Sequence, residues 1–282
     1  MTPSTHLNMH TAAEHESTFT LSDGSMLAYT LHPEPLPGAP RLVLIHSLAL
    51  DRSVWDGVLE QMRNAAQVLT YDCRGHGRSD RRAVRFTAEL FARDLAELLD
   101  HVGWQTANIA GCSMGGSVAL AFGGLYRDRA ASLGLIDTTA WYGPDAPLRF
   151  RERAEAARAS GMQGLIDFQV TRWFGDDFRA AHADVLHRTA AIFVANDFEC
   201  YAASCGLLGD VDVRAHLPAL HMPVVIVVGE DDVATPLAMA QHLHEAIPHS
   251  TLTILPGARH LTPIERPDAI AEALLHLLNT RT

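Results

Sequence analysis

The stretch Ala107-Asn108-Ile109-Ala110-Gly111-Cys112-Ser113-Met114-Gly115-Gly116 decides the fold of this chain. An apolar, strand-like run ends in a G-x-S-x-G pattern, and helix-forming residues follow from Ser117 to Tyr126. This order predicts a strand, a sharp turn and a helix, with Ser113 at the tip of the turn as a nucleophile. Glycine two residues to either side suits a turn too tight for side chains and a strained backbone at the serine.

Length, composition and charge narrow the class of protein. The 282 residues allow one large α/β domain with an inserted subdomain. The apolar share of 48% is ordinary for a globular protein with a sizeable core. A formal net charge of −11 argues against nucleic acid as a partner, because phosphate binding needs clustered Lys and Arg. No apolar run approaches the length of a membrane span, so we expect no membrane partner.

The cysteines and the first residues bear on compartment and cofactors. Cys73, Cys112, Cys200 and Cys205 match no zinc or redox spacing, so we expect reduced thiols in a cytoplasmic protein without a cofactor. Residues 1–17 lack the apolar core of a signal peptide and are expected to form a flexible N-terminal tail. We expect no metal there, because nothing holds the tail histidines in a fixed shell; these are His6, His10 and His15.

Short apolar runs alternate with helical patterns along most of the chain. Ser22-Asp23-Gly24 is a turn signal before residues 26–31, so a hairpin is expected to open the fold. The alternation predicts an α/β fold, with a mostly parallel sheet flanked by helices. The expected strands are 26–31, 41–46, 68–71, 107–110, 132–136, 223–228 and 251–255, and the expected helices include 87–102, 236–247 and 267–278.

Residues 141–216 break this alternation. They hold alanine-rich helical patterns with scattered aromatic residues and no good parallel strand. We therefore expect a helical cap at 141–216, entered through a hinge at 143–147. Residues 18–140 and 217–282 are then expected to form the core domain.

A serine hydroxyl is a weak nucleophile, so it needs a base and an acid that orients the base. Glu230, Asp231 and Asp232 follow the apolar strand 224–228. The spacing of Asp232 from the helix start at Thr235-Pro236 favours it as the acid, and Asp231 is the alternative. Acids also gather at helix starts without any catalytic role. His260, between the last expected strand and the last helix, completes the order of nucleophile, acid and base found in α/β-hydrolases.

Two backbone amides are expected to stabilise an oxyanion. One belongs to Met114, because free N–H groups occur at the start of a helix. The other lies in the loop after strand 41–46, where we assign Leu48 and keep Ser47 as the alternative. His46 is either a second base or, as we favour, a structural residue of that loop.

These landmarks resemble the α/β-hydrolase fold superfamily from about Phe19 to Leu278. Such a fold implies an eight-stranded, mostly parallel sheet flanked by helices, with an inserted helical cap. Within the superfamily the chain is most similar to the 3-oxoadipate enol-lactonases. The motifs that carry the similarity are residues 46–51 with Trp55, residues 74–80, and the cap segments 161–162, 172–174, 195–203 and 212–214.

Two positions depart from that family. It usually has Asn where His46 stands, and it tends to carry an Arg, able to meet a substrate carboxylate, where this chain has Trp141. Arg pairs with carboxylate bidentately, and Trp cannot. Trp141 and Tyr142 instead suggest an apolar or aromatic acyl or leaving group. Candidate substrate contacts are His46, Ser47, Trp141, Tyr142 and Trp173, and candidate replacements for the missing cation are Arg149, Arg151, Arg153 and Arg172.

The triad and the resemblance together predict a serine hydrolase that cleaves a lactone or carboxylic ester through an acyl-enzyme. The resemblance implies 3-oxoadipate enol-lactone or a related lactone of aromatic-compound catabolism as the small-molecule substrate. The same triad fits a C–C bond hydrolase acting on a ring-cleavage product, or a general carboxylesterase or perhydrolase. A non-catalytic receptor or scaffold is disfavoured, because the chain keeps all three triad residues. A monomer and a homo-oligomer remain open.

Overall fold

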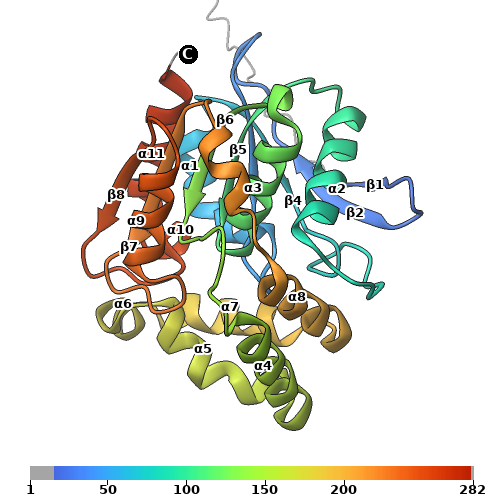
Figure 1. Ribbon diagram of the computed structural model, residues 1–282, viewed down its shortest axis with the longest axis vertical. Coiled ribbons are helices and arrows are strands. Elements are labelled where there is room, and N and C mark those ends of the chain that lie inside the picture. The colour runs from blue at the N-terminus through green and yellow to red at the C-terminus, as the bar shows by residue number, and fades with distance from the viewer. Residues whose placement is uncertain (1–15, 281–282) are drawn as a thin grey trace, which may run out of the picture.

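The computed structural model describes residues 16–280, which form an eight-stranded sheet covered by helices (Figure 1). The strand order is β1-β2-β4-β3-β5-β6-β7-β8, and β2 alone runs in the opposite direction to the other strands. The predicted α/β fold with a mostly parallel sheet is confirmed. The strands are β1 (Glu16–Thr20), β2 (Met26–Leu31), β3 (Arg41–Ile45), β4 (Gln67–Tyr71), β5 (Ala107–Cys112), β6 (Ala130–Ile136), β7 (Val224–Gly229) and β8 (Thr251–Leu255).

The chain enters the sheet through the hairpin of β1 and β2. Glu16 and Ser17 already pair with Thr30 and Tyr29, so the tail expected at 1–17 extends too far by these two residues. The boundary was missed because β1 is short, largely polar and half exposed, which leaves little apolar signal. Residues 1–15, which include the three tail histidines His6, His10 and His15, lie outside the described residues.

Helices cover both faces of the sheet. On β6, Leu133 faces α3, since a Cβ added to Gly123 of that helix would meet it, whereas a Cβ on Gly134 would meet Leu274 of α11. Successive strand residues point to opposite faces, so α3 and α11 lie on opposite sides. Helix α1 packs against α11, and α2 packs against α3. The bounds are α1 (Asp56–Met62), α2 (Ala88–His101), α3 (Met114–Leu125), α9 (Leu237–Ala246), α10 (Thr262–Glu265) and α11 (Pro267–Asn279).

Five helices between β6 and β7 form a separate layer at one end of the sheet, the lower part of Figure 1. Trp141 and Asp212 form an antiparallel bridge, which brings the entry and exit of this layer together. The helices occupy the stretch where a cap was expected from the sequence. They are α4 (Ala146–Ser160), α5 (Ile166–Trp173), α6 (Asp176–Ala181), α7 (Ala183–Val194) and α8 (Phe198–Asp210).

Two sequence expectations, on the cysteines and on membrane segments, can be compared with the described residues. All four cysteines are buried free thiols. Within residues 16–280, none of the helices has both the length and the apolar character needed to span a bilayer.

Gly115 lies in the first turn of α3, where the helix approaches the end of β3. A Cβ at this position would overlap the carbonyl oxygen of Ile45 and lie 2.7 Å from that of His46. These are backbone atoms of a central strand and its loop, so they cannot move aside as a side chain can. We expect Gly115→Ala to lower the free energy of unfolding by at least about 2 kcal/mol, measured by urea denaturation.

Gly206 in α8 provides the matched control. Nothing lies within 4 Å of a Cβ added there. Gly206→Ala should therefore raise the free energy of unfolding by about 0.5–1 kcal/mol, because alanine suits a helix interior better than glycine. Equal stability of the two variants would contradict the close approach of α3 to β3.

Candidate active site

Ser113 lies at the turn between β5 and α3 in a strained conformation, with φ 55° and ψ −115°. Its N–H donates to the carbonyl of Ile136 at 2.9 Å. Its own carbonyl accepts from the N–H groups of Gly116 and Ser117, and from the Thr138 hydroxyl at 2.7 Å. Because hydrogen bonds fix the residue from both sides, the side chain is held out from the sheet edge in one orientation.

His260 connects Ser113 to an acid. Its Nε2 lies 2.8 Å from Ser113 Oγ, and its Nδ1 lies 2.8 Å from Asp232 Oδ2. The serine hydroxyl can donate to Nε2 while Nδ1–H donates to the carboxylate, which is the arrangement a general base needs. All three side chains are buried, so this hydrogen-bonded chain is shielded from water.

In the loop after β7, the carboxylate of Asp232 is buried and hydrogen-bonded, unlike that of its neighbour Asp231. The N–H groups of Ala234 and Thr235 donate to Asp232 Oδ1, and the Thr235 hydroxyl donates to Oδ2. Burial alone would raise the pKa of Asp232, but the charge of His260 and these hydrogen bonds hold it below the usual value. Asp231, the alternative acid, is exposed.

A second buried acid, Asp137, follows β6 and was not singled out from the sequence. Its Oδ2 accepts from the N–H and hydroxyl of Thr262, and its Oδ1 accepts from the N–H of Gly229. Burial, followed by the charge of Asp232, raises its pKa well above the usual value. It links β6 to β7 and to the start of α10, so it supports the loops that carry Asp232 and His260. An acid directly after a predicted parallel strand was the signal available in the sequence.

The backbone expected to form the oxyanion hole lies beside Ser113. Met114 is the first residue of α3, so its N–H has no acceptor within the helix. Ser47 and Leu48 line the same cavity as Ser113 and His260. Both segments expected to supply the oxyanion amides therefore lie next to Ser113.

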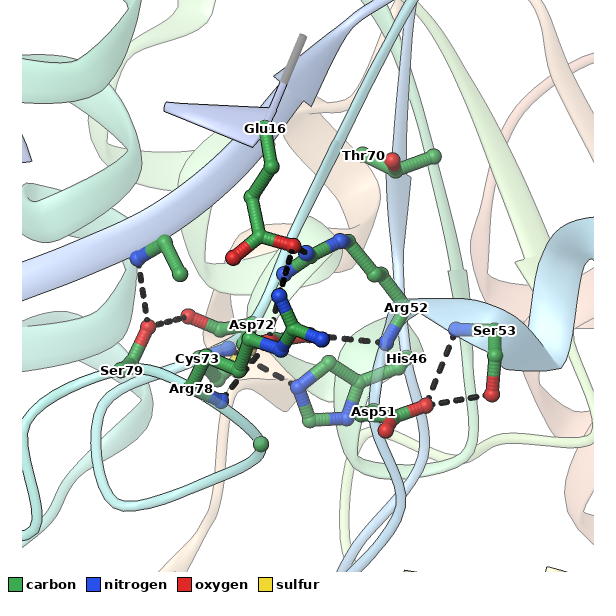
Figure 2. A network of polar contacts seen from close by, with 12 residues as sticks. Glu16, His46, Asp51, Arg52, Ser53, Thr70, Asp72, Cys73, Arg78 and Ser79 are labelled. Atoms are coloured by element: carbon green, nitrogen blue, oxygen red, sulfur yellow. Dashed lines mark hydrogen bonds and ion pairs between the residues drawn. The ribbon is translucent and has the colours of Figure 1, made fainter. Parts of the chain in front are cut away.

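His46 lies behind this loop and not in the cavity. Its Nε2 accepts from the N–H of Cys73 at 2.8 Å, and its Nδ1–H donates to the Ser47 carbonyl at 2.7 Å. Asp72 extends the support: its carboxylate accepts from the backbone and the guanidinium of Arg52 and from the N–H of Arg78 (Figure 2). Because both ring nitrogens are used to hold the loop, these hydrogen bonds favour the structural role of His46 over a role as second base or substrate contact.

Arg74 and His76 belong to the same support. Arg74 is 1% exposed and forms a bidentate pair with Asp94, at 2.9 and 2.7 Å. The His76 ring lies 5.0 Å from that of His46, between centroids. Neither residue lines the cavity at Ser113, so the sequence motif 74–80 is a structural brace of the loop.

A narrow cavity at Ser113, called the inner cavity, shares part of its lining with a wider one, called the outer cavity. The inner cavity has a volume of about 30 Å³ and the outer about 450 Å³. Tyr142 and Trp173 were expected here, and both line the inner cavity. The residues common to both cavities are Tyr142, Phe150, Arg153, Arg172 and Ala234.

Trp141 is absent from the lining of both cavities, contrary to expectation. Its ring is covered by the Arg214 guanidinium, 3.8 Å from the ring centroid, and its backbone pairs with Asp212. Since neighbouring residues in extended chain point in opposite directions, Tyr142 enters the cavity while Trp141 packs at the hinge. Among the four candidate cations, Arg153 and Arg172 line the inner cavity, Arg149 reaches only the outer one, and Arg151 lines neither.

The cap is fastened to both catalytic loops. The Asn196 side chain donates to the Ala49 carbonyl at 2.7 Å, and the N–H of Leu261 donates to the Trp173 carbonyl at 3.1 Å. The buried Glu265 accepts from the N–H groups of Gly175 and Arg259. Glu265 was missed from the sequence, because an acid near a helix start is ordinarily a solvated one.

Residues 16–280 contain no group of three His, Cys, Asp or Glu side chains placed to hold an ion.

The chain belongs to the alpha/beta hydrolase fold family, whose model matches residues 40–267. It is thus a hydrolase-fold protein in which Ser113, His260 and Asp232 lie in hydrogen-bond contact.

Within this family, the chain is similar to several named hydrolases. The chain is 29% identical to 3-oxoadipate enol-lactonase 2 of Acinetobacter baylyi, over 83% of this chain and 87% of that one. It is 28% identical to the putative carbamate hydrolase RutD of Pseudomonas savastanoi pv. phaseolicola, over 86% and 95%. The crystal structure of the enol-lactonase from Burkholderia xenovorans LB400 superposes with a TM-score of 0.88 at 30% identity, covering 94% of this chain and all of that one.

The burial of His46 predicts how the free energy of unfolding changes with pH. Burial lowers the pKa of His46 to about 4, while the Ser47 carbonyl and Asp51 oppose the shift. Between pH 6.5 and 4 the unfolded chain takes up a proton that the folded chain refuses, so the free energy of unfolding falls as the pH falls. We expect His46→Asn to flatten this slope by about 1.4 kcal/mol per pH unit in urea titrations.

The exposed His242 of α9 offers the control, and His242→Asn should leave the slope as in the parent protein. An undiminished slope in His46→Asn would show that His46 is charged in the folded state.

Proposed function

We propose that the protein is a serine hydrolase that cleaves a lactone or carboxylic ester through an acyl-enzyme. The observation that carries the proposal is the unbroken hydrogen-bonded chain from Asp232 through His260 to Ser113, which ends in a cavity. The lactonase relatives support the substrate class.

Acylation begins when Ser113 Oγ attacks the carbonyl carbon. His260 Nε2 accepts the hydroxyl proton, and Asp232 stabilises the imidazolium that forms. The carbonyl π pair moves to oxygen, where the amides of Met114 and Leu48 stabilise the negative charge; losing one such donor typically costs about 3 kcal/mol. Collapse of the tetrahedral intermediate breaks the C–O bond, and His260 returns the proton to the leaving oxygen.

Deacylation repeats these steps with water as the nucleophile. In a lactone the leaving alcohol or enol stays attached to the acyl group, so the cavity must hold the opened ring. His260 accepts a proton from water, which attacks the ester carbonyl, and Ser113 leaves with that proton. Ring opening of an enol-lactone in this way gives a keto acid after tautomerisation. We extend the lactonase likeness to 3-oxoadipate enol-lactone or a related lactone as substrate.

Replacing the nucleophile gives the direct test. We expect Ser113→Ala to fold normally and to lose at least about a thousandfold in kcat, because the covalent step is abolished. Hydrolysis is followed by absorbance on an enol-lactone, on a 4-nitrophenyl ester and on a vinylogous diketone. Turnover of the diketone alone would instead identify a C–C bond hydrolase.

Two outcomes would overturn the proposal. One is parent-like turnover in Ser113→Ala. The other is failure of a fluorophosphonate to label Ser113 in the folded parent protein, which would favour a non-catalytic role.

The choice of acid is tested by a matched pair of substitutions. Asp232→Asn keeps the shape but removes the charge that orients and stabilises the imidazolium, so kcat should fall by about 10³–10⁴-fold. Asp231→Asn changes an exposed neighbour and should stay within about twofold of the parent. A larger loss of kcat in Asp231→Asn than in Asp232→Asn would show that Asp231 is the acid and that the choice of Asp232 is wrong.

A further inference from the structure

Glu265, at the end of α10, joins the cap to the loop that carries His260. Its Oε1 accepts from the N–H of Gly175, the residue before α6, at 2.9 Å, and its Oε2 accepts from the N–H of Arg259 at 2.8 Å. Glu265 is 5% exposed, so both hydrogen bonds are shielded from water. Arg259 directly precedes His260, and the bridge thus ends one residue from the proposed base.

The other side of His260 is fastened to the cap as well. The N–H of Leu261 donates to the Trp173 carbonyl at 3.1 Å. The Arg259 guanidinium adds a contact with the Asp176 carboxylate at 3.2 Å. The residues before and after the histidine are therefore both held by the segment in which α5 ends and α6 begins.

The same segment carries part of the cavity wall. Three residues of α5 line the inner cavity, namely Gln169, Arg172 and Trp173. Ser113 and His260 line it from the core. Because the loop of His260 is bonded to the end of α5, a displacement of this helix would move the imidazole together with the cavity wall.

The core holds the backbone of Glu265 in place through the short helix α10. The N–H of Glu265 donates to the Leu261 carbonyl at 2.9 Å. Thr262, the first residue of α10, donates its N–H and its hydroxyl to the buried carboxylate of Asp137. The side chain of Glu265 therefore extends from a fixed backbone to the junction between the cap and the histidine loop.

A carboxylate suits this junction because two donors from separate segments need an acceptor with two oxygens. Glutamine has the same shape, but its amide NH2 is a donor and would face a backbone N–H. A buried charge is unfavourable unless hydrogen bonds compensate it, and here each oxygen accepts one. Gly175 permits the close approach, since a Cβ there would lie 2.9 Å from Glu265 Oε1 and from the Gly257 carbonyl oxygen.

We infer that Glu265 is a positioning residue, which bonds the cap to the loop of His260 and thereby fixes the 2.8 Å distance between His260 Nε2 and Ser113 Oγ. Acylation needs this contact, because the hydroxyl proton passes along it to the imidazole. A misplacement of about 1 Å can cost on the order of 10²-fold in rate. The inference rests on the proposed function, which assigns His260 the role of base.

Substitutions on either side of the bridge test the positioning. Glu265→Gln can keep one of the two hydrogen bonds, and Glu265→Ala keeps neither. On a 4-nitrophenyl ester we expect kcat to fall by about 10-fold in the first and about 100-fold in the second, with KM within about threefold of the parent. Gly175→Ala pushes the cap away from the same carboxylate without changing its charge, so kcat should again fall by about 10-fold.

Two controls match these variants. Glu272 lies on α11 and is exposed, so Glu272→Gln removes an acid near α10 without touching the bridge. Nothing lies within 4 Å of a Cβ added to Gly206 in α8, so Gly206→Ala changes a cap glycine without displacing the cap. Both variants should keep the kcat and KM of the parent. Circular dichroism and thermal unfolding identify any variant that fails to fold.

A double-mutant cycle separates positioning from a purely structural role. If Glu265 acts through the imidazole, adding Glu265→Gln to His260→Ala should leave the residual kcat unchanged, because the base that it positions is gone. A bridge that only shapes the cavity would lower kcat by the same factor in both backgrounds. Equal factors, or a parent-like kcat in folded Glu265→Ala, would overturn the inference and leave the proposed function standing.

Proton–carbon NMR on protein with 13C-labelled histidine reads the position of the imidazole without turnover. The ring signal of His260 is identified by its absence in His260→Ala. Glu265→Ala and Gly175→Ala should both shift this signal, and Gly206→Ala should leave it in place. A shift in both variants, in a parent that hydrolyses no ester, would support the bridge and overturn the proposed function. An unshifted signal in both would overturn the inference whether or not the parent is active.

Discussion

The site depends on the tight contact between the start of α3 and the ends of β3 and β5. Gly115 lies directly against the carbonyl oxygens of Ile45 and His46, and Ser113, two residues earlier, has a positive φ of 55°. This contact brings the start of α3 against the residues that lead into the loop at Ser47 and Leu48. Strain at the serine is tolerated because hydrogen bonds to Ile136 and Thr138 hold the turn from both sides.

The arginines near the loop after β3 have acidic partners, whereas two arginines of the cavity at Ser113 have none among the described residues. Around the loop after β3, Asp72 pairs with Arg52 (Figure 2). Arg74 pairs with both Asp94 and Asp23. Beneath the cap, Arg153 and Arg172 have no acidic partner in the described chain. Both arginines line the cavity at Ser113.

Much of the fold could be predicted from the sequence, because local signals coincide with the elements. Apolar runs mark β3 to β8 within one or two residues at most ends. Thr87 directly precedes α2 and caps it, because its hydroxyl accepts from the N–H of Leu90. The polar strand β1 carried no such signal and was missed. In the site, Asp137, Gln169 and Glu265 were overlooked, since each acts through partners more than 20 residues away or through burial that only packing creates.

The sequence by itself determined the nucleophile turn, the order of serine, acid and histidine, and the presence of helices between β6 and β7. These follow from glycine spacing and hydrophobic periodicity, which act over a few residues. Only the tertiary structure decided that His46 braces the loop, that Trp141 points away while Tyr142 points in, and that Arg153 and Arg172 converge. Side-chain direction and charge balance depend on neighbours from distant parts of the chain, and these become fixed only when the cap packs over the sheet.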